Sequence, residues 1–206
     1  EREEGFREME WAWRRDGAKC PLGYNATTAL IQPRIIGWIS TYKAGDRTLH
    51  VAPYSFFIDV ARGAQPYVAF CPFRGDGGAT KKDAQKDAEE TGAFVYNMVT
   101  KDLAVKMNLS AAEVPREASE FELAGLEMEE ARTVDAPAVR GAPVRYECEY
   151  VKTVDVASFS IVIGKVKGVW VSGKVVTDGG VDAMKARPVT RLGYMDEYGL
   201  LPHNGD

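Results

Sequence analysis

The order of strand-like and helix-like segments constrains this fold more than any other feature of the chain. Runs rich in β-branched and aromatic residues, the pattern of strands, recur without a helix between each pair. A doubly wound parallel sheet would alternate strand and helix, so the order favours an antiparallel β-barrel with helices on its outside. The predicted strands are residues 35–42, 48–52, 67–73, 93–98, 144–154 and 158–171.

Helices are predicted at three places between these strands. Residues 24–31 allow one or two turns, and residues 100–108 form a second helix. The third follows the loop 74–79, with Thr80 as its N-cap and Gly92 as its C-terminal glycine.

The remaining segments are predicted as periphery of one domain. Residues 109–142, rich in acids and prolines, are expected to run over the surface, and residues 174–177 to continue the sheet. The tail after Pro188 has no strong period. We therefore divide the chain into an N-terminal arm, residues 1–23, which holds Trp11 and Trp13, and one domain, residues 24–206.

Composition excludes several classes of protein. The net charge of −4 argues against a general nucleic-acid binder, which needs a basic surface. No apolar run reaches the roughly 18 residues of a membrane span, and the charged residues 1–4 do not form a signal peptide. Three distant cysteines without a C-x-x-C pair and only two histidines predict reduced thiols, a cytoplasmic protein and no metal site.

Candidate binding residues lie around two strand ends and one helix start. Small polar residues stand beside aromatic ones in residues 33–38 and 52–57, a mixture that suits a flat ring and an anion. The loop from Gly75 to Gly78 precedes a helix, whose free N–H groups favour anions, but it fits no complete phosphate-loop pattern. Lys81, Lys82 and Lys86 follow, either as a solvated helix face or as the partners of a phosphate.

Several motifs in order resemble the flavin reductase-like proteins of the FMN-binding split-barrel fold. Residues 33–41, PRIIGWIST, are similar to the family's P-R-P-I-G-W-V-S-T, and residues 52–57, APYSFF, match A-P-Y-S-F-F. Further matches are Lys82-Asp83, residues 90–97 (ETGAFVYN), residues 121–126 (FELAGL) and residues 187–193 (RPVTRLG), the last followed by Tyr198.

The resemblance implies a mainly β split barrel that forms homodimers and binds FMN in a groove between subunits. Its function would be that of an FMN-dependent oxidoreductase, either a flavin reductase or an electron-transfer protein that acts on a small flavin or acceptor. Carried over residue by residue, the resemblance implies that Arg34 and Lys82 offset the negative charge of the phosphate. Trp38 and Tyr54 would form part of the pocket wall. Ser40, Thr41, Ser55 and Phe56 would contact the ring edge and ribityl chain. Arg191 and Tyr198 resemble the motif that closes the site.

The chain departs from the family pattern at several places, which include the residues near Cys71-Pro72 and a longer loop at residues 73–80. Ala84 replaces a threonine that would donate to the phosphate, Ile58 replaces an asparagine, and Asp87 adds a negative charge where asparagine is common. A degenerate barrel that has lost its flavin is therefore the alternative, with Ala84→Thr plus Asp87→Asn expected to restore affinity. Relatives that use NADH carry G-D-H where this chain reads Ala157-Ser158-Phe159, which favours a donor other than NADH or NADPH.

A third hypothesis is a split barrel that binds another cofactor, such as haem or a deazaflavin, because one fold hosts several ligands. His50 is the internal histidine available as an axial haem ligand.

Overall fold

The computed structural model of the protein describes residues 26–194 and 197–200. The predicted arm, with Trp11 and Trp13, lies outside the described residues. Described helices are α1 (Ala26–Leu30), α2 (Asp83–Thr91), α3 (Ala104–Leu109), α4 (Glu120–Leu123) and α5 (Ala183–Ala186), with 3-10 turns η1 (Asp76–Gly78), η2 (Lys101–Leu103) and η3 (Gly173–Val175).

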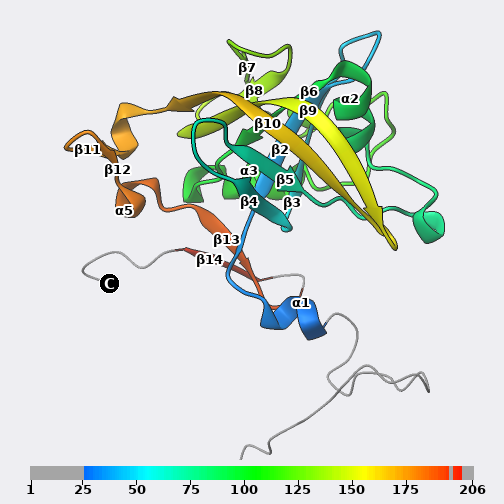
Figure 1. The fold of residues 1–206 in the computed structure, drawn as a ribbon, viewed down its shortest axis with the longest axis horizontal. Helices are drawn as coiled ribbons and strands as arrows, with labels where there is room; N and C mark the ends of the chain where they lie inside the picture. The colour runs from blue at the N-terminus through cyan, green and yellow to red at the C-terminus, as the bar shows by residue number, and fades with distance from the viewer. Residues whose placement is uncertain (1–25, 195–196, 201–206) are drawn as a thin grey trace, which may run out of the picture.

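A seven-stranded antiparallel sheet, curled into an open barrel, forms the body of the protein (Figure 1). Its strand order is β3-β2-β6-β9-β10-β5-β4. The mainly β split-barrel prediction is therefore confirmed. The strands are β2 (Gly37–Tyr42), β3 (Leu49–Tyr54), β4 (Phe57–Ala61), β5 (Tyr67–Phe70), β6 (Ala93–Asn97), β9 (Val144–Val156) and β10 (Phe159–Val171).

The β9–β10 hairpin is the longest feature of this sheet, with thirteen residues in each strand. It bends across the barrel in Figure 1, and its register shifts at Gly164 and again at Gly168. A Cβ at Gly164 would lie 2.3 Å from the ring of Phe94. Glycine is needed there because the ring of the barrel core packs directly on the backbone of the hairpin.

Two apolar clusters divide the interior. One fills the barrel under α2 and includes Ile39, Phe70 and Phe94. The other lies between the sheet and the helices α3 and α4, and includes Trp38, Met107 and Phe121. Packing on both faces explains why every residue of β2 is buried, including the three that carry hydroxyl groups, Ser40, Thr41 and Tyr42.

A small second sheet holds the C-terminal hairpin against the start of the chain. Its order is β1-β13-β14, formed by β1 (Arg34–Ile35), β13 (Val189–Leu192) and β14 (Glu197–Leu200). It projects from the barrel next to α1 (Figure 1). No local pattern after Pro188 predicts this hairpin, because its pairing partner β1 lies more than 150 residues earlier.

The segment 109–142 differs from the predicted surface excursion. It carries α4 and the two-stranded sheet of β7 (Met128–Glu130) and β8 (Pro137–Val139). Phe121, Ala138 and Val139 are at most 1% exposed and belong to the core. Strand β8 is buried at all three positions and therefore lacks the alternation by which a half-buried strand is recognised.

Two local predictions change, and a third is confirmed. Residues 174–177 do not extend the sheet but form η3 and the separate pair β11 (Val176–Thr177) and β12 (Gly180–Val181). Lys82, not Thr80, is the N-cap of α2, and the Thr80 hydroxyl donates to Asp76 instead. Gly92 does end α2 in the left-handed conformation, as predicted.

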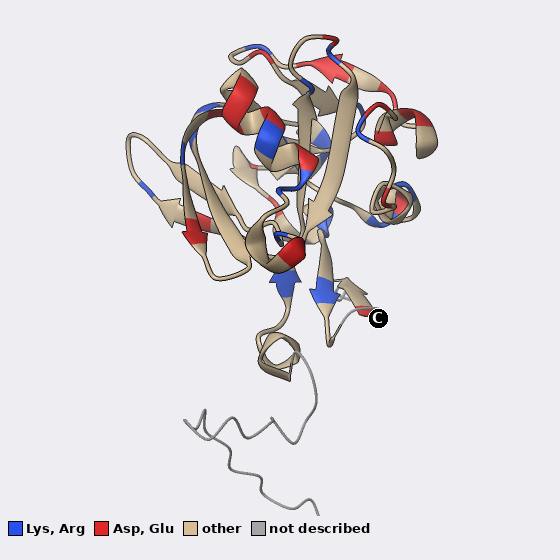
Figure 2. Cartoon of the chain, turned by 90° about the vertical axis from the view of Figure 1, so that its right-hand side faces the viewer, with Lys and Arg blue, Asp and Glu red and all other residues tan. Residues whose placement is uncertain are grey.

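Helix α2 carries four acidic residues, Asp83, Asp87, Glu89 and Glu90, and one basic residue, Lys86 (Figure 2). Within residues 26–194 and 197–200, no helix is both long and apolar enough to cross a lipid bilayer.

Candidate functional site

A cavity of about 530 Å³, here called the aromatic cavity, opens where several parts of the fold meet. These are α1, the ends of β3 and β5, the start of α2, helix α3, the start of β10 and the hairpin β13–β14. The volume is within the range of sites for small molecules and cofactors, about 300–1,000 Å³. Its lining residues are Thr28, Ile36, Pro53, Tyr54, Ser55, Phe56, Cys71, Phe73, Lys82, Met107, Ala111, Ser158, Phe159, Arg191, Tyr194 and Tyr198.

Phenyl rings form one wall of this cavity. Phe159 packs on Phe56 with ring centroids 5.7 Å apart, and on Phe73 at 5.3 Å in an edge-to-face arrangement. The amide of Cys71 donates to the carbonyl of Phe56, which fixes the turn after β3 against the end of β5. Such a wall presents flat apolar area to a planar ligand.

Polar groups come from the other sides. Lys82 Nζ lies 2.7 Å from Glu113 Oε1, in an exposed ion pair. Arg191 donates to the hydroxyl of Tyr198, which donates in turn to Asn108 Oδ1 at 3.2 Å. The cavity therefore combines aromatic walls with two cationic side chains.

A second cavity of about 500 Å³, here called the lysine cavity, adjoins the first. Both are lined by Pro53, Tyr54, Lys82 and Ala111. Its further lining includes His50, Lys81, Lys86, Arg116 and Glu120. Burial and the neighbouring carboxylates raise the pKa of Tyr54 far above its usual value, so the phenol between the cavities stays neutral.

The carboxylate of Asp87, which is fully buried in α2, is compensated inside the protein. Its Oδ2 accepts from Thr41 Oγ1 at 2.8 Å and lies 2.7 Å from His50 Nδ1. Its Oδ1 accepts from Arg116 at 2.7 Å. Asp87 thus points into the protein, so the expected repulsion of a bound phosphate has no support in this arrangement.

His50 is held between two acceptors. Its Nδ1 faces Asp87, and its Nε2 lies 2.9 Å from the carbonyl of Arg116. A neutral imidazole has one N–H, so both contacts are satisfied when the ring is protonated. Burial disfavours that charge, yet the hydrogen bond to Asp87 and its charge outweigh burial, and the pKa of His50 is raised. Both ring nitrogens are engaged, which leaves His50 unsuited to bind a haem iron.

Six of the ten residues assigned to flavin by resemblance line the aromatic cavity: Tyr54, Ser55, Phe56, Lys82, Arg191 and Tyr198. The other four do not line it. Trp38 is fully buried and donates to Ser110 Oγ at 2.9 Å. Ser40 is bound to the carbonyl of Pro137, and Thr41 to Asp87.

Arg34 is the fourth, and it is 6% exposed. Its guanidinium donates to backbone carbonyls of Thr28, Ile31, Leu192 and Gly193. These carbonyls belong to the end of α1 and the turn after β13. Arg34 therefore ties the two segments that flank the aromatic cavity.

Sequence reasoning missed part of the lining. Met107 and Cys71 were not assigned to the site, and Tyr194 follows the matched motif by one residue. Burial raises the pKa of the half-buried Cys71 thiol, so it stays protonated. Ile58, one of the departures from the family pattern, is 53% exposed on β4 and does not line the cavity.

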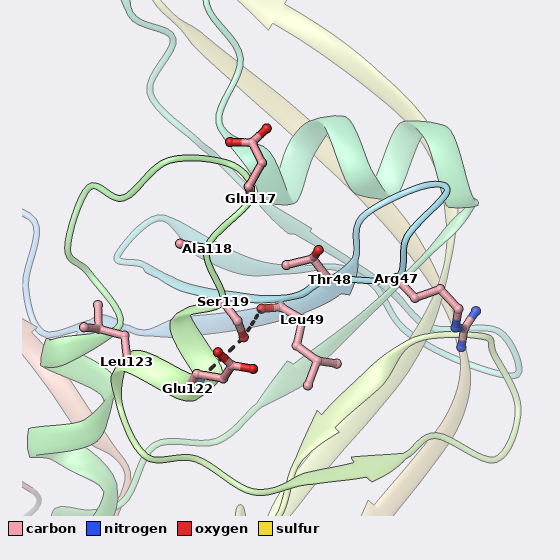
Figure 3. A pocket seen from close by; sticks show the side chains of 8 residues that line it. All are labelled: Arg47, Thr48, Leu49, Glu117, Ala118, Ser119, Glu122 and Leu123. Atoms are coloured by element: carbon pink, nitrogen blue, oxygen red, sulfur yellow. Dashed lines mark hydrogen bonds between the residues drawn. The ribbon is translucent and has the colours of Figure 1, made fainter.

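A third hollow lies between the start of β3 and α4 and shares no lining residue with the first two (Figure 3). Arg47 points away from its centre and pairs with Asp135 at 2.8 Å, while Ser119 bonds to Leu49. It has no aromatic wall. Among the described residues, no three His, Cys, Asp or Glu side chains gather to hold a metal ion.

Comparisons with known proteins agree with this geometry. An uncharacterized protein of Deinococcus radiodurans is 34% identical over 187 residues, which cover 89% of this chain and 81% of that protein. Nitrilotriacetate monooxygenase component B from Bacillus cereus has the same fold, with a TM-score of 0.86 and 25% identity over 97% of this chain and 100% of that chain. Flavoredoxin of Desulfovibrio vulgaris (Miyazaki F) superposes with a TM-score of 0.75 and 20% identity, over 90% and 94% of the two chains.

The model of the flavin reductase like domain matches residues 32–189, most of the chain. The predicted resemblance is confirmed: the chain belongs to the flavin reductase-like family.

Proposed function

We propose that this protein binds FMN in the aromatic cavity and works as an electron-transferring oxidoreductase. One observation supports this most. Six motif residues from three parts of the sequence, residues 54–56, Lys82, and the hairpin residues 191 and 198, converge on one cavity. A resemblance confined to sequence would not require these segments to meet.

The residues present fit a flavin mononucleotide. Phe56, Phe73 and Phe159 offer flat apolar surface to a tricyclic ring, and Ser55 offers a hydroxyl beside it. Lys82, at the start of α2, supplies positive charge for a phosphate next to free backbone N–H groups of a nine-residue helix. The flavin would supply the redox chemistry, and the protein binds, orients and shields it from water.

Three departures from the family pattern, at Ala84, Ile58 and Asp87, suggested the alternative of a barrel that has lost its flavin. Two of them do not support it in the structure. Asp87 is compensated inside the protein, and Ile58 lies on the outside of β4. Ala84, which lines the lysine cavity, is the remaining departure.

The electron donor of this proposal is a reduced carrier other than NADH or NADPH. Phe159 stands where NADH-using relatives carry a histidine, and it packs into the aromatic wall. The cavity therefore offers a phenyl ring in place of an imidazole hydrogen-bonding group at this position.

The test is an FMN titration followed by tryptophan and flavin fluorescence, repeated with riboflavin, which lacks the phosphate. We expect FMN to bind, to remain after desalting, and to bind more tightly than riboflavin. Lys82→Gln should remove most of that preference, and the exposed Lys174→Gln should keep it. A protein that takes up neither flavin refutes the proposal.

We also propose that a second copy of the chain covers the face beside the cavity. Leu30 and Ile31 are 71% exposed, Ile35 is 50% exposed, and Tyr198 and Leu200 are each 37% exposed. The strand register places Tyr198 and Leu200 on one face of the small sheet and Ile35 on the other, and Arg34 ties the end of α1 to the same hairpin. Tyr198 also lines the aromatic cavity, so these exposed side chains extend to its edge.

Light scattering is expected to give twice the chain mass. Ile31→Glu should lower it to the monomer mass, while Val181→Glu, which is equally exposed but lies on β12, should not. A monomeric protein at micromolar concentration refutes the second proposal.

A further inference from the structure

Two arginines face each other beside the aromatic cavity, and neither has a carboxylate partner in the described part of the chain. Arg34 on β1 and Arg191 on β13 are directly opposite each other in the antiparallel pair. Neither forms an ion pair with an Asp or Glu among residues 26–194 and 197–200. Like charges at opposed strand positions repel, so this pair costs stability unless an anion offsets it.

Arg34 cannot be the residue that meets such an anion. It is 6% exposed, and both of its terminal nitrogens donate to carbonyls of α1 and of the turn after β13, while its buried Nε has no hydrogen-bond partner among the described residues. Carbonyl oxygens satisfy its hydrogen bonds but bring no negative charge. Its positive charge therefore remains beside Arg191, and both burial and Arg191 lower the pKa of Arg34.

Arg191 is the partner that lines the cavity. One terminal nitrogen donates to the Tyr198 hydroxyl, and its guanidinium lies 4.6 Å from the centre of the Tyr198 ring. Its remaining N–H groups donate to no described residue. Tyr198 is fixed by its own bond to Asn108, so the guanidinium is held in place with donors to spare.

Lys82, the other cationic side chain of the cavity, already has a carboxylate partner. Lys82 is already paired with Glu113 at 2.7 Å and stands at the start of α2, where the phosphate of the proposed flavin would be bound. The charge that no Asp or Glu among the described residues offsets is at Arg191. Phe73 and Tyr194, 46% and 45% exposed, lie along the same cavity and provide ring surface for a second molecule.

We propose that Arg191 binds the oxyanion group of a second ligand, a flat aromatic or conjugated molecule that carries a carboxylate. The aromatic side chains of the cavity hold its plane, and Arg191, reinforced by the buried charge of Arg34, selects its charge. This deepens the proposed function, because it gives the substrate class of the same site, and it rests on a flavin that leaves Arg191 uncovered.

The test compares benzoate with benzamide, which has the same ring and nearly the same shape but no charge. Binding is measured by titration calorimetry on the FMN-saturated protein and on the flavin-free protein. We expect benzoate to bind at least about tenfold more tightly than benzamide, as a charge-assisted hydrogen bond to arginine implies. Arg191→Gln should abolish this preference, Arg191→Lys should keep part of it, and the control Lys174→Gln should keep all of it.

The same variants show whether the anion at Arg191 is the phosphate of FMN or the carboxylate of a second ligand. If Arg191→Gln weakens FMN but not riboflavin, the anion at Arg191 is the phosphate of the flavin itself, and the inference is overturned. Equal binding of benzoate and benzamide to the wild-type protein overturns it as well. Riboflavin binding shows that each variant is folded. If FMN fails to bind while the preference for benzoate persists in the flavin-free protein, the proposed function fails and the anion site stands.

Discussion

Replacing Asp87 by asparagine tests whether this carboxylate is structural or an obstacle to flavin. From the sequence, Asp87→Asn removes a negative charge from the helix that binds phosphate and should raise flavin affinity. In the structure, it removes the common acceptor of Thr41, His50 and Arg116. The two expectations have opposite signs, which makes the variant informative.

The magnitude follows from the contacts. An asparagine has one acceptor oxygen where the carboxylate has two. If that oxygen faces Arg116, the amide N–H groups of the asparagine face the N–H and O–H donors of His50 and Thr41, which then lack an acceptor. In the reverse orientation, the amide N–H groups face Arg116, and its guanidinium lacks an acceptor. Removing one partner of a buried charge pair costs about 3–5 kcal/mol. This is a large part of the total stability of a domain, about 5–15 kcal/mol.

For a chain of this length, each kcal/mol lowers Tm by about 2–4 °C, so Asp87→Asn should lower Tm by about 6–20 °C. Urea unfolding at neutral pH and calorimetry measure the loss. Glu90→Gln is the matched control, since Glu90 contacts the same Arg116 at 3.2 Å but is half exposed, and it should cost less than about 1 kcal/mol. If Asp87→Asn costs no more than Glu90→Gln, or tightens FMN binding, the structural interpretation is wrong.

Three further predictions follow from other contacts. Because the pKa of His50 is raised on folding, its stabilising contribution is complete below about pH 6.5 and declines as the pH rises through the higher pKa of the folded state; the difference in unfolding free energy between the wild type and His50→Gln should therefore shrink towards alkaline pH. Glu113→Gln frees the lysine at the start of α2 and should tighten FMN about twofold to fivefold in a fluorescence titration, with no change for riboflavin. Gly164→Ala drives a methyl group into the ring of Phe94 and should cost about 1–3 kcal/mol in urea unfolding, whereas Gly173→Ala, with open space around it, should change little; equal costs would contradict the packing.

Local chemistry made much of the barrel predictable. The turn after residue 42 and the alternation that follows it predict the β2–β3 hairpin, which is present. Gly92 ends α2 because only a residue that tolerates positive φ stops a helix in this way, and its φ is 79°. Such features depend on residues within a few positions of one another, so the sequence displays them directly.

Features that depend on distant partners were not predictable in this way. Strand β13 pairs with β1 across about 155 residues, and its four residues have no period of their own. Asp87 meets His50 and Arg116 from 37 and 29 residues away, so the residue type alone suggested repulsion where the fold supplies compensation. In both cases the local sequence does not show which distant residues the strand or the side chain will contact.

The same reasoning applies to the lysines at and before the start of α2. In sequence, three lysines at a helix start are either a solvated helix face with charge pairs or the partners of a phosphate. In the folded protein each of them meets a carboxylate: Lys81 with Glu89, Lys82 with Glu113, and Lys86 with Asp83. Arg191 stands alone in the sequence, yet with Arg34 opposite it and no described carboxylate beside it, it keeps its charge for a ligand. An anion is attracted by positive charge that the fold leaves uncompensated. A single basic residue without acidic neighbours therefore predicts an anion site better than a motif with several basic residues that are paired with carboxylates.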